Sequence, residues 1–156
     1  MIWRRRRLGS EEGAELVEFA LVLPFLLLVV LGIAEFGILL QRYEVLVNAA
    51  REGARVAVLP GYSDTDVSAR VTQYIDSGRV PYTSTNPTIA TTSQSLVISP
   101  GVGLPTTTIP MKRVTVTYTY TFMFLPTFAR WGRAANPSFS TLTLTTVAEM
   151  RVEAGS

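Results

Sequence analysis

The chain has 156 residues and a formal net charge of +2. This length leaves room for one small folded domain, because a hydrophobic core needs on the order of 100 residues. The absence of Cys and His excludes disulfides, thiolate chemistry, imidazole general bases and the usual zinc ligands. The arginines 4–7 and two nearby glutamates account for the whole net charge. Because the remainder is neutral, we expect no nucleic-acid partner.

The N-terminal third predicts a membrane-spanning helix. Phe19 to Ala34 contains no charged residue, and the wider segment 14–40 is apolar apart from three glutamates. At about 1.5 Å per residue this segment forms a helix of roughly 40 Å, enough to cross a hydrocarbon core of about 30 Å. The arginines precede the apolar run, and positive flanking segments stay in the cytoplasm. We therefore expect a single-pass transmembrane helix at 14–40, with the C-terminal domain outside the cytoplasm.

Polar and helix-breaking residues interrupt this span. Pro24 removes one backbone donor and favours a helix kink. Glu18 places a carboxylate in the apolar helix, which costs about 2.5 to 3.5 kcal/mol at the bilayer centre when ionised. It is either paired with a positive group or placed at the headgroup level, solvated or protonated. Glu35 and Arg42 lie at the outer end of the span and are interpreted as ordinary interfacial charges.

Segment 13–19, Gly-Ala-Glu-Leu-Val-Glu-Phe, resembles the processing site of type IV pilin-like proteins of the tight-adherence (Tad, or Flp pilus) systems. In that class a basic leader ends in Gly, and a Glu five residues later is followed by Phe or Tyr. The resemblance extends through 17–21, 23–24, 32–37 and 49–55, which are similar to the TadE-like signature. Nothing comparable identifies residues 60–156.

The resemblance implies a minor pilin or pseudopilin of a Tad-type pilus. Residues 1–13 would be a leader peptide that a prepilin peptidase removes between Gly13 and Ala14. Glu18, followed by Phe19, would pair with the new amino group of Ala14, usually on a neighbouring subunit. The implied partners are the peptidase, other pilin or pseudopilin subunits, the Tad inner-membrane platform and membrane lipid. The implied location is the bacterial inner membrane or a surface pilus involved in adhesion.

Two alternatives stay open. The protein could be a membrane-anchored Tad assembly factor that never enters the filament. It could instead be a secreted adhesin-like domain whose signal peptide is cleaved after the small-residue site Gly32-Ile33-Ala34, leaving Glu35 as the first residue. Against this second alternative, glutamates interrupt the start of the apolar run, and the helical pattern continues past Ala34.

Beyond the membrane, residues 41–59 predict an amphipathic stalk helix that Pro60 and Gly61 end. Apolar side chains recur there at helical spacing, namely at Leu39, Tyr43, Leu46, Val47, Ala50, Ala54 and Val58. Gly53 and Ala54 are small enough to let another element approach closely. We expect that element to be the chain's own sheet rather than another subunit.

Residues 60–156 predict an extracytoplasmic α+β domain. Ser63 to Asp66 resembles a helix cap, and the short helix that follows should end at Gly78. Residues 79–110 are interpreted as loops with one strand near 95–99. Apolar and threonine residues alternate over 114–124 and, less cleanly, over 138–153, which predicts two longer strands. We expect a small antiparallel sheet packed on the stalk helix, with the aromatic face of 114–124 in the core.

The loop at 125–137 contains Phe128, Arg130, Trp131 and Arg133. It is either a contact for a partner or the membrane surface, or a solvated loop with one buried aromatic residue. The sequence contains no phosphate-binding glycine loop and no metal-ligand spacing, and its many hydroxyl side chains have no evident base to activate them. We therefore expect no enzymatic activity, no cofactor and no metal.

Overall fold

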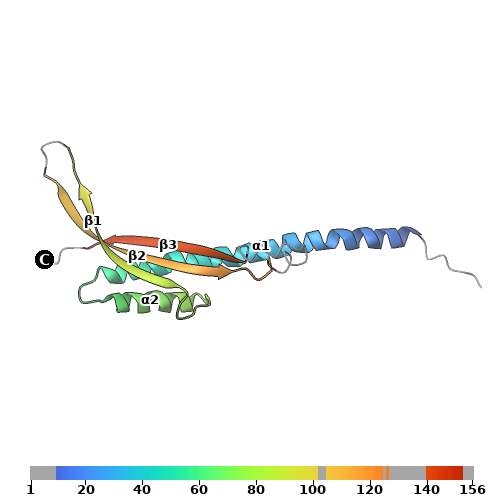
Figure 1. Cartoon of the computed structure of the whole chain (residues 1–156), viewed down its shortest axis with the longest axis horizontal. Helices are drawn as coiled ribbons and strands as arrows, with labels where there is room; N and C mark the ends of the chain where they lie inside the picture. Colours follow the sequence, from blue (N-terminus) through green and yellow to red (C-terminus); the bar gives the residue numbers. More distant parts are fainter. Residues whose placement is uncertain (1–9, 102–104, 125, 127–139, 153–156) are drawn as a thin grey trace, which may run out of the picture.

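A computed structural model describes residues 10–101, 105–124, 126 and 140–152 of the chain (Figure 1). It contains two helices and three strands. In chain order these are α1 (Ser10–Ala57), α2 (Asp64–Ser77), β1 (Thr88–Ile98), β2 (Thr107–Thr121) and β3 (Thr141–Arg151). A long N-terminal helix and a small antiparallel sheet confirm the predicted α+β class. The arginines 4–7 and the loop with Phe128 and Trp131 lie outside the described residues.

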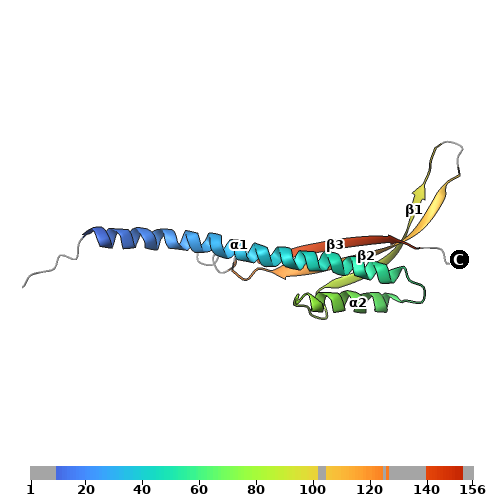
Figure 2. The ribbon, with the colours of Figure 1, turned by 180° about the vertical axis from the view of Figure 1, so that it is seen from behind.

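Helix α1 is continuous over 48 residues, but only its C-terminal half packs on the rest of the chain (Figure 2). It runs through Pro24 without a break, so the kink at that residue stays a prediction. The helix ends at Ala57, two residues before the expected end at Leu59. There the N–H of Leu59 donates to the carbonyl of Val56, and Gly61 adopts a φ of 84°, a conformation that glycine allows.

Helix α2 begins and ends as its sequence predicts. The Ser63 hydroxyl accepts a hydrogen bond from the N–H of Asp66, and the Asp66 carboxylate accepts one from the N–H of Ser63 at 2.8 Å. This reciprocal pair is a capping box, which satisfies backbone donors that the first helical turn leaves without partners. At the other end, the N–H of Gly78 donates to the carbonyl of Tyr74.

The sheet is antiparallel with strand order β1-β2-β3. The β1–β2 register runs from Thr88 opposite Thr117 to Ile98 opposite Thr107. The interpretation of residues 79–110 as loops with one short strand was therefore wrong, because β1 starts earlier and β2 begins at Thr107. These stretches are rich in Thr and Ser and lack apolar alternation, so pairing across the hairpin decides their conformation.

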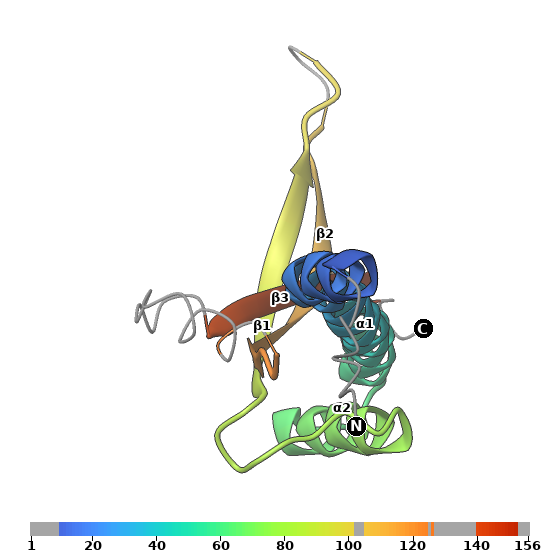
Figure 3. The same ribbon diagram turned by 90° about the vertical axis from the view of Figure 1, so that its right-hand side faces the viewer.

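One hydrophobic core joins α1, α2 and the inner face of β2. Both helices lie on the same side of the sheet (Figure 3). The buried side chains of this core include Leu46, Ala50, Ala54, Val67, Val71, Ile75, Val114, Val116, Tyr118 and Tyr120. The aromatic strand face is thus core, as predicted, whereas Tyr43 of the stalk is 42% exposed.

Gly53 marks the closest approach of α1 to its neighbours. A Cβ atom there would lie 2.5 Å from Cγ2 of Val71 and 3.3 Å from Cγ1 of Val114. The small residues of the stalk therefore pack on the chain's own elements, as predicted, but the nearest of these is α2 and not the sheet.

Candidate functional site

The predicted processing site lies near the start of α1. Gly13, Ala14, Glu18 and Phe19 are all helical and exposed. A Cβ atom at Gly13 would meet no other group within 4 Å. Because α1 begins at Ser10, cleavage between Gly13 and Ala14 requires its first turns to unwind, as fraying helix ends can do. The roles of these residues stay predictions.

Between Leu16 and Ala34, α1 presents apolar side chains around its circumference, apart from Glu18. Leu16, Phe19, Leu21, Phe25 and Ile33 are each 59% to 69% exposed. A contiguous apolar surface of this kind marks a membrane or protein contact. The helix is long and apolar enough to cross a membrane, and its most apolar stretch is not buried within the chain. From Ala14 to Ala34 it measures roughly 31 Å at about 1.5 Å per residue, close to the thickness of a hydrocarbon core.

Glu18 lies in this exposed half of α1. No hydrogen bond or ion pair joins its carboxylate to another residue that the structure describes. A carboxylate that enters an apolar phase requires a positive group or donor. Such a partner for Glu18 would have to come from outside the described part of this chain.

Glu35 ties the long helix α1 to the end of the sheet. Its side chain is only 1% exposed, so its interpretation as an ordinary interfacial charge was wrong. The carboxylate accepts hydrogen bonds from the N–H of Met123 and from the N–H of Phe124, the latter at 3.2 Å. Backbone donors thereby satisfy a buried acid at the place where α1 leaves the domain.

The burial of Glu35 follows from helical spacing. Leu39 is one turn further along α1, and it is buried at 7% exposure. Residues four apart share one face of a helix, so Glu35 extends the face that packs on the sheet. The sequence shows this spacing, but an acidic side chain at the end of an apolar run normally indicates exposure, so the sequence alone favours the wrong interpretation.

Arg42 occupies the next turns of the same junction. Its guanidinium lies 4.8 Å from the ring centroid of Tyr120 and donates to the hydroxyl of Tyr118 at 3.4 Å. Burial, and then the negative charge of Glu35, raise the pKa of the Tyr120 hydroxyl. Arg42 is therefore half-buried against two tyrosines of β2 rather than an ordinary interfacial charge.

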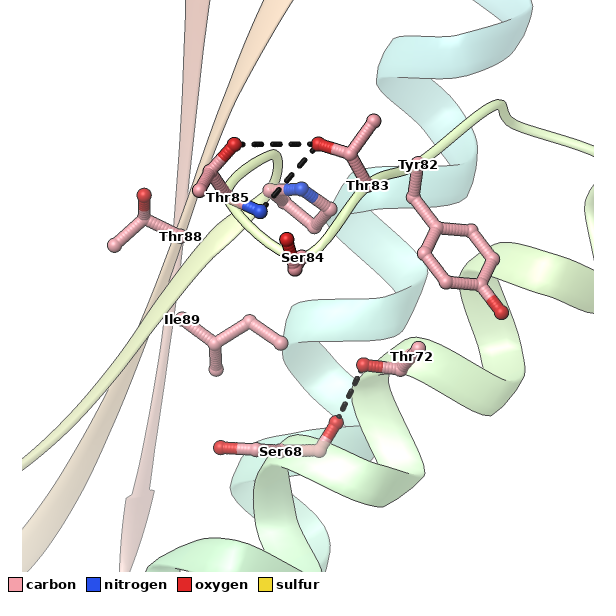
Figure 4. Close-up of a pocket in the computed structure, with 9 residues that line it drawn as sticks. Ser68, Thr72, Tyr82, Thr83, Ser84, Thr85, Thr88 and Ile89 are labelled. Atoms are coloured by element: carbon pink, nitrogen blue, oxygen red, sulfur yellow. Dashed lines mark hydrogen bonds between the residues drawn. The ribbon is translucent and has the colours of Figure 1, made fainter.

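The domain also has a hollow of about 420 Å³ between α2 and the start of β1 (Figure 4). Hydroxyl side chains dominate its lining, from Ser68, Thr72, Tyr82, Thr83, Ser84, Thr85 and Thr88. The lining contains no acid or amine to activate a hydroxyl, so it forms no nucleophile with a base. Within the described ranges, no group of three or more acidic side chains could hold a metal ion. The expectations of no enzymatic activity, no cofactor and no metal stay predictions.

These features define a class of protein in which one exposed apolar helix continues into a small α+β domain. A comparison with known protein families finds a match for this helix. Residues 13–55 match the family model described as TadE-like protein, which confirms the resemblance seen in the sequence. The match covers most of α1, including Glu18, Glu35 and Gly53, and links the chain to the Tad pilus system in general. No curated protein and no solved structure matches the chain.

Proposed function

We propose that the chain is a minor pilin or pseudopilin of a Tad-type pilus, processed by a prepilin peptidase and inserted through its N-terminal helix. One observation carries the proposal, namely that α1 is apolar on all sides from Phe19 to Ala34 and then continues into the domain without a break. Such a helix holds its domain at a fixed height above a membrane or a filament axis. The TadE-like match over residues 13–55 supports the same assignment.

Cleavage between Gly13 and Ala14 would remove the basic leader and create an amino group on Ala14. Glu18 lies four residues further on, about one helical turn away. When α1 leaves the bilayer for a bundle of helices, the Glu18 carboxylate pairs with this amino group on a neighbouring subunit. The pair satisfies both charges in an apolar setting and fixes the register of the two helices. Phe19, 59% exposed, packs beside it.

The proposed location is the inner membrane, with the domain outside the cytoplasm. The arginines 4–7 support this orientation because positive segments next to a membrane helix stay in the cytoplasm. The partners that this proposed function implies are the prepilin peptidase, other pilin or pseudopilin subunits, the Tad inner-membrane platform and lipid.

The intact mass of the membrane-extracted protein tests the processing step. We expect a chain that starts at Ala14, and the Gly13→Val variant should retain the leader. Gly32→Val is the matched control, because no group lies within 4 Å of a Cβ at either glycine. A wild-type mass that starts at Met1 would exclude prepilin processing. A mass that starts at Glu35 would establish a secreted domain instead.

Filaments sheared from the cell surface test the second step. We expect the processed chain in this fraction, and the Glu18→Ala variant should be processed normally but largely lost from it. Glu15→Ala, one turn nearer the N-terminus, serves as the control. Normal incorporation of the Glu18→Ala variant would contradict the pairing. A wild-type chain that is processed but stays wholly in the membrane would identify an assembly factor.

A further inference from the structure

The outer edge of β1 lacks the features that normally keep a sheet edge from pairing. β1 has 11 residues, Thr-Ile-Ala-Thr-Thr-Ser-Gln-Ser-Leu-Val-Ile, without a charge, a proline or a glycine. Its pairing with β2 runs from Thr88 to Ile98 without a bulge. Natural proteins usually protect such edges with charges, prolines or bulges. Among the described residues, no strand pairs with the outer edge of β1.

The other two strands carry such features. β2 contains Pro110, Lys112 and Arg113, and β3 contains Glu149 and Arg151. The sequence therefore places charges and a proline elsewhere in the same sheet but none in β1. This contrast indicates that another strand pairs with the outer edge of β1.

The end of the β1–β2 hairpin adds apolar surface to this edge. β3 pairs with β2 only from Met111 to Thr121, so the hairpin extends beyond β3 and both helices (Figure 1). Leu96, Val97 and Ile98 are 50%, 57% and 43% exposed. Because successive residues point to opposite faces, both faces of the hairpin are apolar there. A two-stranded ribbon with this surface is marginal in water and gains stability from a further strand.

The direction of the strands determines which strand of another subunit can pair with β1. β1 and β3 are both antiparallel to β2, so they run in the same direction, and each has 11 residues. Copies that share one membrane orientation, as the proposed function requires, present all their strands in the same direction. Antiparallel pairing of β1 with a second β1 would invert one of the two anchors. β1 of one copy can, however, lie parallel to β3 of the next.

We propose that the outer edge of β1 binds the outer edge of β3 from a second copy of this chain, which extends the sheet from subunit to subunit. The charges of β3 leave most of its edge uncharged, because Glu149 and Arg151 both lie within its last three residues. Glu149 is already paired with Arg113 of its own sheet, and β1 contributes no charge of its own. The contact joins two different surfaces, so it can propagate along a row of subunits.

The cysteine-free chain allows a direct test. Two tagged copies of the full chain are expressed together, one carrying Gln94→Cys in β1 and the other Val147→Cys, Glu149→Cys or Arg151→Cys in β3, because copies at the same height place Gln94 level with Arg151. All four positions are exposed, on the sheet face away from the helices. After oxidation in membranes we expect a disulfide-linked heterodimer for at least one pair. Copies with Gln94→Cys alone, or with Ala69→Cys on α2 paired with the same β3 cysteine, should give at least tenfold less product.

A second variant distinguishes cross-links that result from pairing of β1 with β3 from cross-links that result from random collisions. Thr92→Lys, added to the Gln94→Cys copy, places a charge on the exposed edge strand and should abolish the heterodimer. Unchanged thermal unfolding of the domain confirms that this variant is folded. Absence of every β1–β3 product, a dominant Gln94→Cys homodimer, or a product that Thr92→Lys leaves unchanged would overturn the proposal. Because the N-terminal mass is read on the same sample, a processed chain without cross-links rejects the docking alone, whereas a cross-linked chain that keeps Met1 rejects only the processing.

Discussion

The two halves of α1 belong to one continuous helix but meet different surroundings. Before Glu35, large apolar side chains such as Phe25 and Ile33 are exposed. After Glu35, one face is buried against α2 and the sheet, as Leu46 and Ala50 show. The first half therefore depends on partners outside the described chain, whereas the second half is the spine of the domain. The comparison shows that backbone continuity alone does not define a folding unit.

Removal of a large apolar side chain should change the free energy of unfolding very differently in the two halves of α1. Leu46→Ala leaves a cavity at a position with 0% exposure and should lower the free energy of unfolding by about 2 to 5 kcal/mol. Leu27→Ala, at 45% exposure in the first half, should leave domain unfolding unchanged. Chemical denaturation in micelles measures both. Equal losses would show that the first half also packs on the domain.

The junction between the halves should respond to loss of the Glu35 carboxylate. Glu35→Ala leaves the backbone N–H groups of Met123 and Phe124 without this acceptor, which should cost about 1 to 3 kcal/mol. Amide hydrogen exchange at these two residues should accelerate more than exchange at Val116, in the centre of β2. Glu44→Ala, at an exposed position of α1, is the control. Unchanged exchange at Met123 and Phe124 would contradict a tie through Glu35.

A single added methyl group should have opposite effects at a packed and at an unpacked position of α1. Gly53→Ala forces a Cβ against Val71, which is fully buried, and should destabilise the domain by about 1 to 3 kcal/mol. Gly37→Ala meets no group within 4 Å and should stabilise the helix by about 0.5 to 1 kcal/mol. Thermal unfolding of the two variants compares them. A tolerated Gly53→Ala would show that α2 can move away from α1.

The smallest expected effect concerns the ion pairs that Glu52 forms with Arg55 of α1 and with Arg70 of α2. Hydrogen bonds from Arg55 and then Arg70 lower the pKa of Glu52 from 4.5 to about 2. A lowered carboxyl pKa stabilises the folded state above pH 4.5, and this contribution is lost as the pH falls from 4.5 towards 2. Because both arginines are solvent-exposed, we expect about 1 kcal/mol.

The Glu52→Gln variant isolates this effect. Its unfolding free energy should fall less than that of the wild type between pH 5 and about pH 2. Asp66, whose pKa the Ser63 hydrogen bonds also lower, contributes in the same direction in both proteins. The difference between the two denaturation profiles therefore reports Glu52 alone, and identical profiles would show that its ion pairs are too weak to matter.

Local patterns were sufficient to predict several elements. The capping box at Ser63, the alternation that begins at Val114 and the helical spacing up to Ala54 each reflect preferences within a few residues. The early start of β1 and β2 was not predictable in this way. Their threonine-rich stretches carry little apolar signal, and only their pairing with each other makes them strands.

The sequence by itself determined the apolar N-terminal helix and the TadE-like start at Gly13, because hydrophobic length and a short motif are properties of contiguous residues. The tertiary structure decided where the exposed part of this helix ends and the domain begins. Glu35 is buried by residues that follow β2, and Arg42 by residues of β2 itself, all of them some 80 positions away in the chain. No local pattern shows which acid will meet them. The unprotected edge of β1 likewise exists only once the sheet is formed, because an edge is a property of strand order.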